Sequence, residues 1–173
     1  MMPPCRPRSP ACHDIEPHPV AVVTGADRGL GLALSATLLD LGWQVVAGQY
    51  LPSWPELAEL ACRHPRTLAI VPMDVASDAS VSAAAHAAAT IVGHVDLLIN
   101  NAGVNSPDPD RAIRAALDYR EMSRLHEVNA LGPLRVTEAF LPLLDRGTLR
   151  RLCFVSSEAA SITAATRHAW FGY

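Results

Sequence analysis

Short apolar runs alternate with longer helical stretches from Val20 onward. Five of these runs have the length and the continuous apolar character of strands that are covered on both faces of a parallel sheet. They span residues 20–24, 44–48, 67–72, 96–100 and 149–156. Because helical stretches separate the runs, the pattern predicts βαβ units in an α/β, doubly wound parallel sheet. We expect right-handed crossovers and the strand order 3-2-1-4-5.

The helical stretches between the runs carry their own start and stop signals. Residues 30–41, 55–63 and 79–92 are expected to be helices, with Ser53 and Ser77 opening the second and third. Gly42 and Gly93 stand where the first and third should end. After a polar stretch at 104–112, a long helical region at about 115–144 contains Pro133, which we expect to interrupt it.

The length of 173 residues suits one domain, which we place at residues 20–173. The proline-rich segment 1–19 is expected to be a disordered tail. Half of the residues (50%) are apolar and 18% are charged, which is typical of a globular chain. A net charge of −3 argues against nucleic acid and anionic membranes as partners. No apolar run approaches the roughly 18 to 20 residues that span a bilayer, so we expect no transmembrane helix.

The cysteines and the basic residues limit the kinds of metal, disulfide and side-chain chemistry that the sequence allows. Four cysteines occur without a C-x-x-C pair, namely Cys5, Cys12, Cys62 and Cys153. This spacing predicts neither a metal site nor a disulfide framework, and it favours a reducing, cytoplasmic location. All 14 basic residues are arginines, because the sequence contains no lysine.

A glycine-rich segment, T-G-A-D-R-G-L-G at residues 24–31, joins the first predicted strand to the first predicted helix. Glycines permit positive φ and close approach of a ligand to the backbone, and the free N–H groups of a helix start attract phosphate. The segment therefore predicts a site for a pyrophosphate. Taken alone, it leaves open a glycine-rich turn that binds nothing.

This segment resembles the T-G-x-x-x-G-x-G fingerprint of the short-chain dehydrogenase/reductase family. Further segments follow in the order of that family: P-M-D-V at 72–75, N-N-A-G at 100–103, V-N-A at 128–130 and F-V-S-S at 154–157. Together they cover about residues 20–173. The resemblance implies a Rossmann fold and an NAD(P)-dependent oxidoreductase that transfers hydride between nicotinamide and a small-molecule carbonyl or alcohol substrate.

The resemblance also assigns roles to individual residues. Glycines of the turn would cradle the cofactor phosphates, Asp74 would accept a hydrogen bond from adenine, and residues 101–103 would hold the ribose region. The cofactor residues implied are Thr24, Gly25, Arg28, Gly29, Leu30, Gly31, Asp74, Val75, Asn101, Ala102 and Gly103. An Asp after a strand is, without this context, more often a helix N-cap. The catalytic residues implied are Asn129, Ser157 and Tyr173, with Ser156 as the alternative serine.

The choice of cofactor depends on the end of the second strand, where an acidic residue binds the ribose of NAD and repels the extra phosphate of NADP. This chain has Gln49 there and no carboxylate within residues 47–51. Arg28 occupies a position where NADP-using relatives often carry a basic residue. We expect NADP rather than NAD, although a solvated loop arginine is the alternative for Arg28.

Two departures from the family pattern concern the catalytic end of the chain. Ser157 and Tyr173 are more widely spaced than is usual, and the Y-x-x-x-K motif of the family would place its lysine beyond Tyr173. That lysine lowers the pKa of the tyrosine in the family. The sequence is therefore interpreted as an incomplete Rossmann domain that lacks the C-terminal strands and helices. We expect little turnover from these residues alone, and a homo-oligomer stays open for a complete chain. The alternative is a non-catalytic nucleotide-binding fragment or regulatory module.

Overall fold

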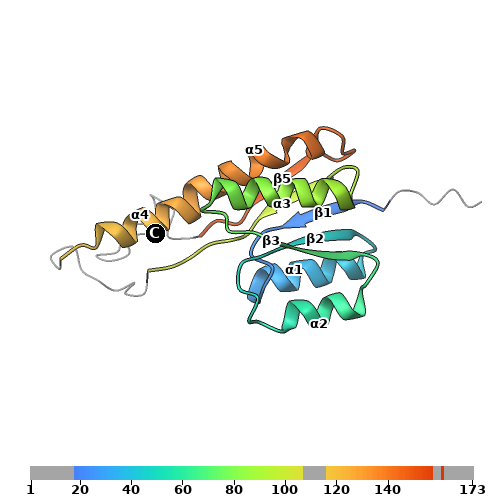
Figure 1. The fold of residues 1–173 in the computed structure, drawn as a ribbon, viewed down its shortest axis with the longest axis horizontal. Coiled ribbons are helices and arrows are strands. Elements are labelled where there is room, and N and C mark those ends of the chain that lie inside the picture. The colour runs from blue at the N-terminus through green and yellow to red at the C-terminus, as the bar shows by residue number, and fades with distance from the viewer. Residues whose placement is uncertain (1–17, 107–115, 158–160, 162–173) are drawn as a thin grey trace, which may run out of the picture.

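One parallel sheet organises the protein in the computed structural model, which describes residues 18–106, 116–157 and Ser161. Within these residues the strand order is β3-β2-β1-β4-β5, with all neighbours parallel, as the sequence predicts (Figure 1). The strands are β1 (Val20–Val23), β2 (Gln44–Gln49), β3 (Leu68–Pro72), β4 (Leu97–Asn100) and β5 (Arg151–Phe154). The chain thus forms the predicted doubly wound α/β fold.

Helices cover both faces of the sheet (Figure 1). One layer holds α1 (Gly29–Asp40) and α2 (Glu56–Arg63), and the other holds α3 (Asp78–Ile91) and α5 (Gly132–Leu144). Successive side chains of a strand point to opposite faces. Ala21 and Val23 accordingly join the core beneath α1 and α2, while Val20 and Val22 join the core beneath α3 and α5. This double burial explains why β1 is continuously apolar.

The last strand differs from the prediction of a strand buried on both faces. β5 is shorter than the expected span of 149–156, and all four of its residues are exposed. Among the described strands it pairs only with β4, so it lies at the edge of the sheet. The strand is the apolar edge expected of an incomplete sheet, and the expectation of burial on both faces was wrong, because an apolar run does not tell whether other segments cover both faces of a strand.

Helix ends follow the predicted signals in part. The Ser77 hydroxyl accepts a hydrogen bond from the backbone N–H of Ser80 at 3.3 Å and caps α3 as expected. Gly42 follows α1 with a φ of +82°, a conformation that glycine adopts without strain. Ser53 does not cap α2, because Pro55 occupies the N-cap position and no side chain caps that helix.

The long helical region consists of α4 (Tyr119–His126), a π-helical turn η1 (Glu127–Leu131) and α5. The regular α-helix is interrupted next to Pro133 as predicted, although the chain continues as a helix, because the proline lies in the first turn of α5. A proline has no N–H to donate to the carbonyl four residues earlier, here that of Asn129. The backbone N–H of Gly132 reaches back to the Glu127 carbonyl instead, in the wider spacing of a π turn. The irregularity therefore falls just before the proline.

The amino-terminal ends of β1, β4 and β5 are tied together by Asp96. Its buried carboxylate accepts hydrogen bonds from the N–H groups of Val20, Thr148 and Leu149. Of the tail predicted at 1–19, residues 1–17 lie outside the described residues. Pro19 belongs to the folded part, because its carbonyl accepts the Gln44 N–H at 2.9 Å.

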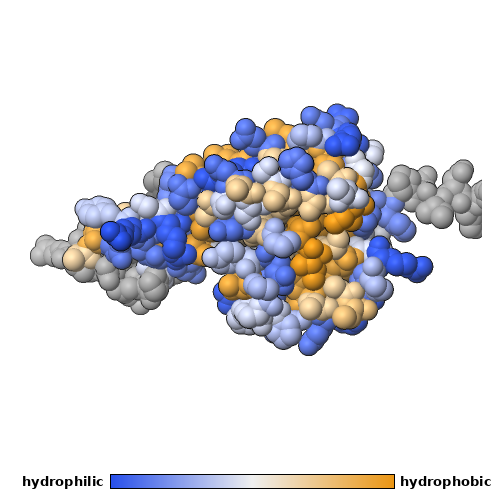
Figure 2. All heavy atoms as spheres, in the orientation of Figure 1, coloured by the Kyte–Doolittle hydropathy of each residue, from blue (hydrophilic) through white to orange (hydrophobic). Residues whose placement is uncertain are grey.

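The surface separates polar from apolar regions (Figure 2). Hydrophilic side chains cover α4, while apolar side chains gather between α3 and the layer of α1 and α2, where the edge strand β3 lies. None of the helices in the described part of the chain is both long enough and apolar enough to cross a bilayer.

Candidate cofactor and active site

The glycine turn after β1 is locked to the segment after β4. The hydroxyl oxygen of Thr24 accepts the backbone N–H groups of Asn101 at 3.0 Å and Ala102 at 2.9 Å. The side-chain amide of Asn101 donates in return to the carbonyls of Thr24 at 3.0 Å and Gly25 at 3.1 Å. Two predicted motifs far apart in the sequence therefore form one rigid unit at the carboxyl edge of the sheet.

The three glycines of the turn serve different needs. Gly25 has a φ of +61°, and a Cβ there would lie 2.9 Å from the Cα of Ala102. A Cβ at Gly31 would overlap the carbonyl oxygen of Gly25. Gly29 has a φ of +54°, yet a Cβ there would meet no protein atom within 4 Å. Gly25 and Gly31 are thus required by packing, whereas Gly29 leaves open space at the start of α1.

That open space has the properties of an anion site. α1 is 12 residues long, no side chain caps its N-terminus, and its first turn contains no acidic residue. The N–H groups of a first helical turn lack partners inside the helix and carry a partial positive charge. The residues present therefore fit the pyrophosphate of a dinucleotide, which would lie against the backbone at Gly29 and Leu30, as the sequence predicts.

Asp27 is a structural residue of the turn that the sequence analysis did not identify. Its side chain is buried, and one carboxylate oxygen accepts the N–H groups of Tyr50 and Leu51, both at 2.9 Å. The glycine turn is thereby fastened to the segment that follows β2. The only sequence signal was a polar residue inside the glycine motif, because its partners lie beyond the next strand.

Arg28 and Gln49, the residues behind the predicted cofactor choice, lie in these two fastened segments. The guanidinium of Arg28 lies over the indole ring of Trp54, 4.8 Å from the ring centroid. Gln49 is half-buried at the end of β2. The structure thus presents a cation and no β2 carboxylate beside the glycine turn.

The segment after β3 is fixed by local hydrogen bonds. Asp74 is not a helix N-cap, because Ser77 has that role in α3. One carboxylate oxygen of Asp74 accepts the Ala76 N–H at 3.0 Å, and its own N–H donates to the hydroxyl of Ser80 at 2.9 Å. Val75 is buried, so its side chain serves packing. The adenine contact expected of Asp74 stays a prediction.

Arg135 on α5 links the segment after β3 to the π turn. It donates to the carbonyl of Val75 at 3.0 Å and forms ion pairs with Glu127 and Asp78. The hydrogen bond to Glu127 is the main cause that raises the pKa of Arg135, and Asp78 adds to it. Nothing in the sequence indicated this cluster, because its members come from separate elements.

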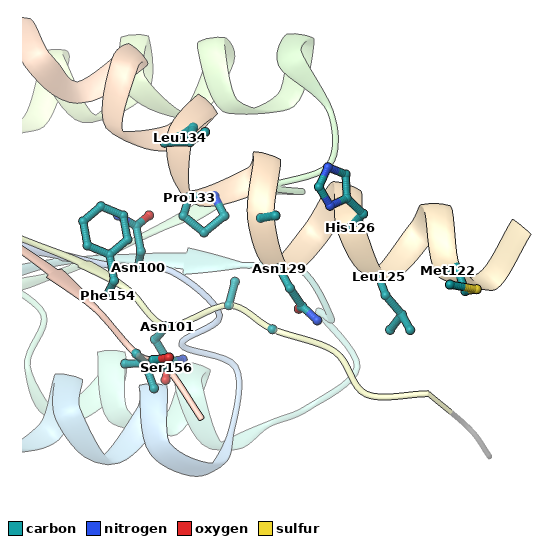
Figure 3. A pocket seen from close by; sticks show the side chains of 14 residues that line it. Asn100, Asn101, Met122, Leu125, His126, Asn129, Pro133, Leu134, Phe154 and Ser156 are labelled. Carbon is teal, nitrogen blue, oxygen red and sulfur yellow. The ribbon is translucent and has the colours of Figure 1, made fainter. Parts of the chain in front are cut away.

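Asn129 is presented by the π turn toward the segment that follows β4 (Figure 3). Its side-chain oxygen accepts the N–H of Val104 at 2.9 Å, and its amide donates to the carbonyl of the same residue at 2.8 Å. This two-point contact closes one wall of a pocket of about 580 Å³ between α4, α5 and the ends of β4 and β5.

The pocket brings several predicted residues together. Its lining includes Asn101, Ala102, Gly103, Asn129 and Ser156. Ser157 is half-buried and does not line the pocket. Tyr173 lies outside the described residues, so its predicted role stays a prediction. Met122, Leu125 and Phe154 add apolar surface that the sequence analysis did not assign to the site.

Comparisons with known proteins agree with this geometry. The family described as short chain dehydrogenase matches residues 19–170. A short-chain dehydrogenase/reductase of Talaromyces stipitatus is 31% identical over 82% of this chain and 54% of its own length. The 1-deoxy-11-beta-hydroxypentalenate dehydrogenase of Streptomyces avermitilis is 37% identical over 84% of this chain and 54% of its own length. The NADPH-bound carbonyl reductase from chicken fatty liver superposes with a TM-score of 0.75 at 33% identity, covering 84% of this chain and 62% of its own.

The chain thus spans about half the length of the curated relatives that it matches. The matched region includes the glycine turn, the end of β4 and the π turn, in the order that the sequence motifs predict. The chain belongs to the short-chain dehydrogenase family.

Proposed function

We propose that this protein binds NADP(H) at the glycine turn and catalyses hydride transfer between the nicotinamide and a carbonyl or alcohol of small to medium size. The observation that carries the proposal is the open, uncapped start of α1 at Gly29, locked beside the end of β4. When bound, the cofactor supplies the hydride. The protein's task is to hold the reactants and to move a proton.

The preference for NADP(H) is supported by charge. A 2′-phosphate would meet the Arg28 cation and no carboxylate at Gln49, and a guanidinium can bind phosphate through two parallel hydrogen bonds. The related carbonyl reductase from chicken fatty liver is NADPH-bound. Asp74 is proposed to accept a hydrogen bond from adenine.

The residues proposed for the catalytic step are Asn129, Ser157 and Tyr173. Asn129 holds the pocket wall through Val104, the serine donates a hydrogen bond to the substrate oxygen, and Tyr173 transfers the proton. Ser156 competes for the serine role because it lines the pocket with Asn129. Replacing each serine by alanine separately distinguishes them, because only the acting serine should affect turnover strongly.

Calorimetric titration with NADP⁺ and NAD⁺ tests the cofactor part. NADP⁺ should bind more tightly to the wild-type chain, and Arg28→Ala should weaken NADP⁺ without weakening NAD⁺. Equal affinities in the wild type, or an equal loss of both in the variant, would contradict the preference.

A second candidate function is a nucleotide-binding module without catalysis. It needs only the cofactor half of the site, which the hydrogen bonds between Thr24 and Asn101 hold without Tyr173. Consumption of NADPH with a panel of aldehydes and ketones, measured for the chain extended through its natural reading frame, separates the two functions. Turnover that Tyr173→Phe abolishes supports the enzyme, whereas tight binding without turnover supports the module.

A cytoplasmic location is proposed on the cysteine pattern, with Cys62 and Cys153 as exposed free thiols.

A further inference from the structure

Two contacts join the glycine turn to the segment after β2, and they involve neighbouring residues of the turn. Asp27 accepts the N–H groups of Tyr50 and Leu51, and Arg28 places its guanidinium over the ring of Trp54. The backbone N–H of Trp54 donates to the Leu51 carbonyl at 3.3 Å. The ring that covers Arg28 therefore belongs to a turn that Asp27 anchors.

We propose that Trp54 is a positioning residue for cofactor selectivity, which holds the Arg28 guanidinium so that its N–H edge meets the 2′-phosphate of NADP(H). The inference rests on the proposed binding of NADP(H). It goes beyond the sequence pattern, because nothing in the glycine motif specifies an aromatic residue after β2.

A cation–π contact suits this task because it holds the guanidinium in place and requires no acceptor for its N–H donors. Among the described residues Arg28 forms no ion pair, so no protein carboxylate there takes those donors. An unsupported arginine loses side-chain freedom when it binds a phosphate. A guanidinium already held by Trp54 loses less of it, and preorganisation of this kind tightens binding.

The contribution of Trp54 should be specific to the phosphate. NAD(H) has a hydroxyl where NADP(H) has the 2′-phosphate, so it gains little from an oriented cation. Trp54 is 37% exposed and lies outside the two core clusters, so its replacement removes little core packing. A purely structural role would weaken both cofactors together, whereas a positioning role weakens only the phosphorylated one.

The test compares Trp54→Leu, Trp54→Phe and Arg28→Ala by calorimetric titration of the full 173-residue chain. The probes are NADP⁺, NAD⁺ and the fragments adenosine 2′,5′-bisphosphate and 5′-AMP, which differ only in the 2′-phosphate. Tyr119→Leu is the control, since it removes an aromatic ring that is 72% exposed on α4. Thermal unfolding confirms that each variant is folded.

Trp54→Leu should weaken NADP⁺ and the bisphosphate about two- to tenfold, the range of a cation–π contact, and leave NAD⁺ and 5′-AMP unchanged. Trp54→Phe should retain most of the affinity, and Tyr119→Leu all of it. An equal loss for both members of a pair, no loss at all, or a phenylalanine variant as weak as the leucine variant would overturn the inference. If the wild type binds neither dinucleotide, the proposed function itself fails. If it binds both equally, only the cofactor preference and the role of Trp54 fail.

Discussion

Replacing Asp96 by asparagine should destabilise the protein without altering its cofactor site. One carboxylate oxygen of Asp96 accepts the N–H groups of Thr148 at 2.8 Å and Leu149 at 3.1 Å. The other accepts the Val20 N–H and contacts the ring nitrogen of His94, both at 3.0 Å. An asparagine has one oxygen, so an NH₂ group must face an N–H group on one side.

The expected loss follows from these contacts. A buried N–H left without an acceptor costs about 1–3 kcal/mol, and hydrogen bonds to a charged group contribute about 1.5–3 kcal/mol each. A loss of about 3 kcal/mol in the free energy of unfolding is therefore expected for Asp96→Asn. In a chain of this size that corresponds to a melting temperature lower by about 6–12 °C.

The effect should depend on pH in one direction. Burial by itself would raise the pKa of Asp96, but the hydrogen bonds from Val20, Leu149 and Thr148 outweigh it, and together with the charge of His94 they lower the pKa. A carboxyl with a lowered folded pKa contributes stability that is complete above its unfolded value, near 4. That contribution is lost as the pH falls through the lower, folded pKa. The contribution of the carboxylate should be present in full above about pH 4, and the gap between wild type and Asp96→Asn should shrink in stronger acid.

Urea unfolding followed by circular dichroism at several pH values measures this gap. Asp40→Asn is the matched control, because Asp40 is an exposed aspartate at the end of α1 and should change stability by less than about 0.5 kcal/mol. NADP⁺ affinity of the folded Asp96→Asn variant should equal that of the wild type. A variant as stable as the wild type at neutral pH, or a gap that widens in acid, would refute the reasoning.

Further substitutions test the site itself. Gly31→Ala should abolish NADP⁺ binding and lower the melting temperature by several degrees, because its Cβ would overlap the turn, while Gly93→Ala, where a Cβ has open space, should do neither. Asp27→Ala should weaken binding of both dinucleotides in titration, whereas Asp27→Asn, which keeps an acceptor, should retain most of the affinity. Asn129→Ala should accelerate amide hydrogen exchange at Val104 and leave NADP⁺ affinity within about twofold, since it removes the acceptor of that N–H.

The parts of the fold predicted from sequence are those that depend on periodicity and on local chemistry. β1 and β2 are buried between two helical layers, so nearly every position in them had to be apolar and the runs were plain. Ser77 and Gly42 acted through their nearest neighbours, and their positions could be predicted without a tertiary structure. Ser53 misled because its residue type was given a fixed meaning as a cap, whereas the first N–H groups of α2 have no side-chain acceptor.

The parts that sequence could not predict depend on contacts between distant segments. Nothing near Asp27 indicates that the N–H groups of Tyr50 and Leu51 will lie within its reach, since that follows from the pairing of β1 with β2. The contact of the Arg28 guanidinium with the Trp54 ring arises in the same way. The exposure of the β5 side chains depends on which segments cover the two faces of that strand, which no run of apolar residues encodes.

The cofactor site at the glycine turn and the pocket beside α4 and α5 are held by different contacts, so substitutions should affect them differently. The cofactor half is fixed by the sheet, because β1 pairs directly with β4 and the hydrogen bonds between Thr24 and Asn101 extend that pairing past the strand ends. The pocket half is held by the helices, through the contact of Asn129 with Val104 and the ion pairs of Arg135. A strand pair cannot shift by less than a residue, whereas helices can slide by small amounts. Substitutions in α4 and α5 should therefore reshape the pocket while the glycine turn keeps its geometry.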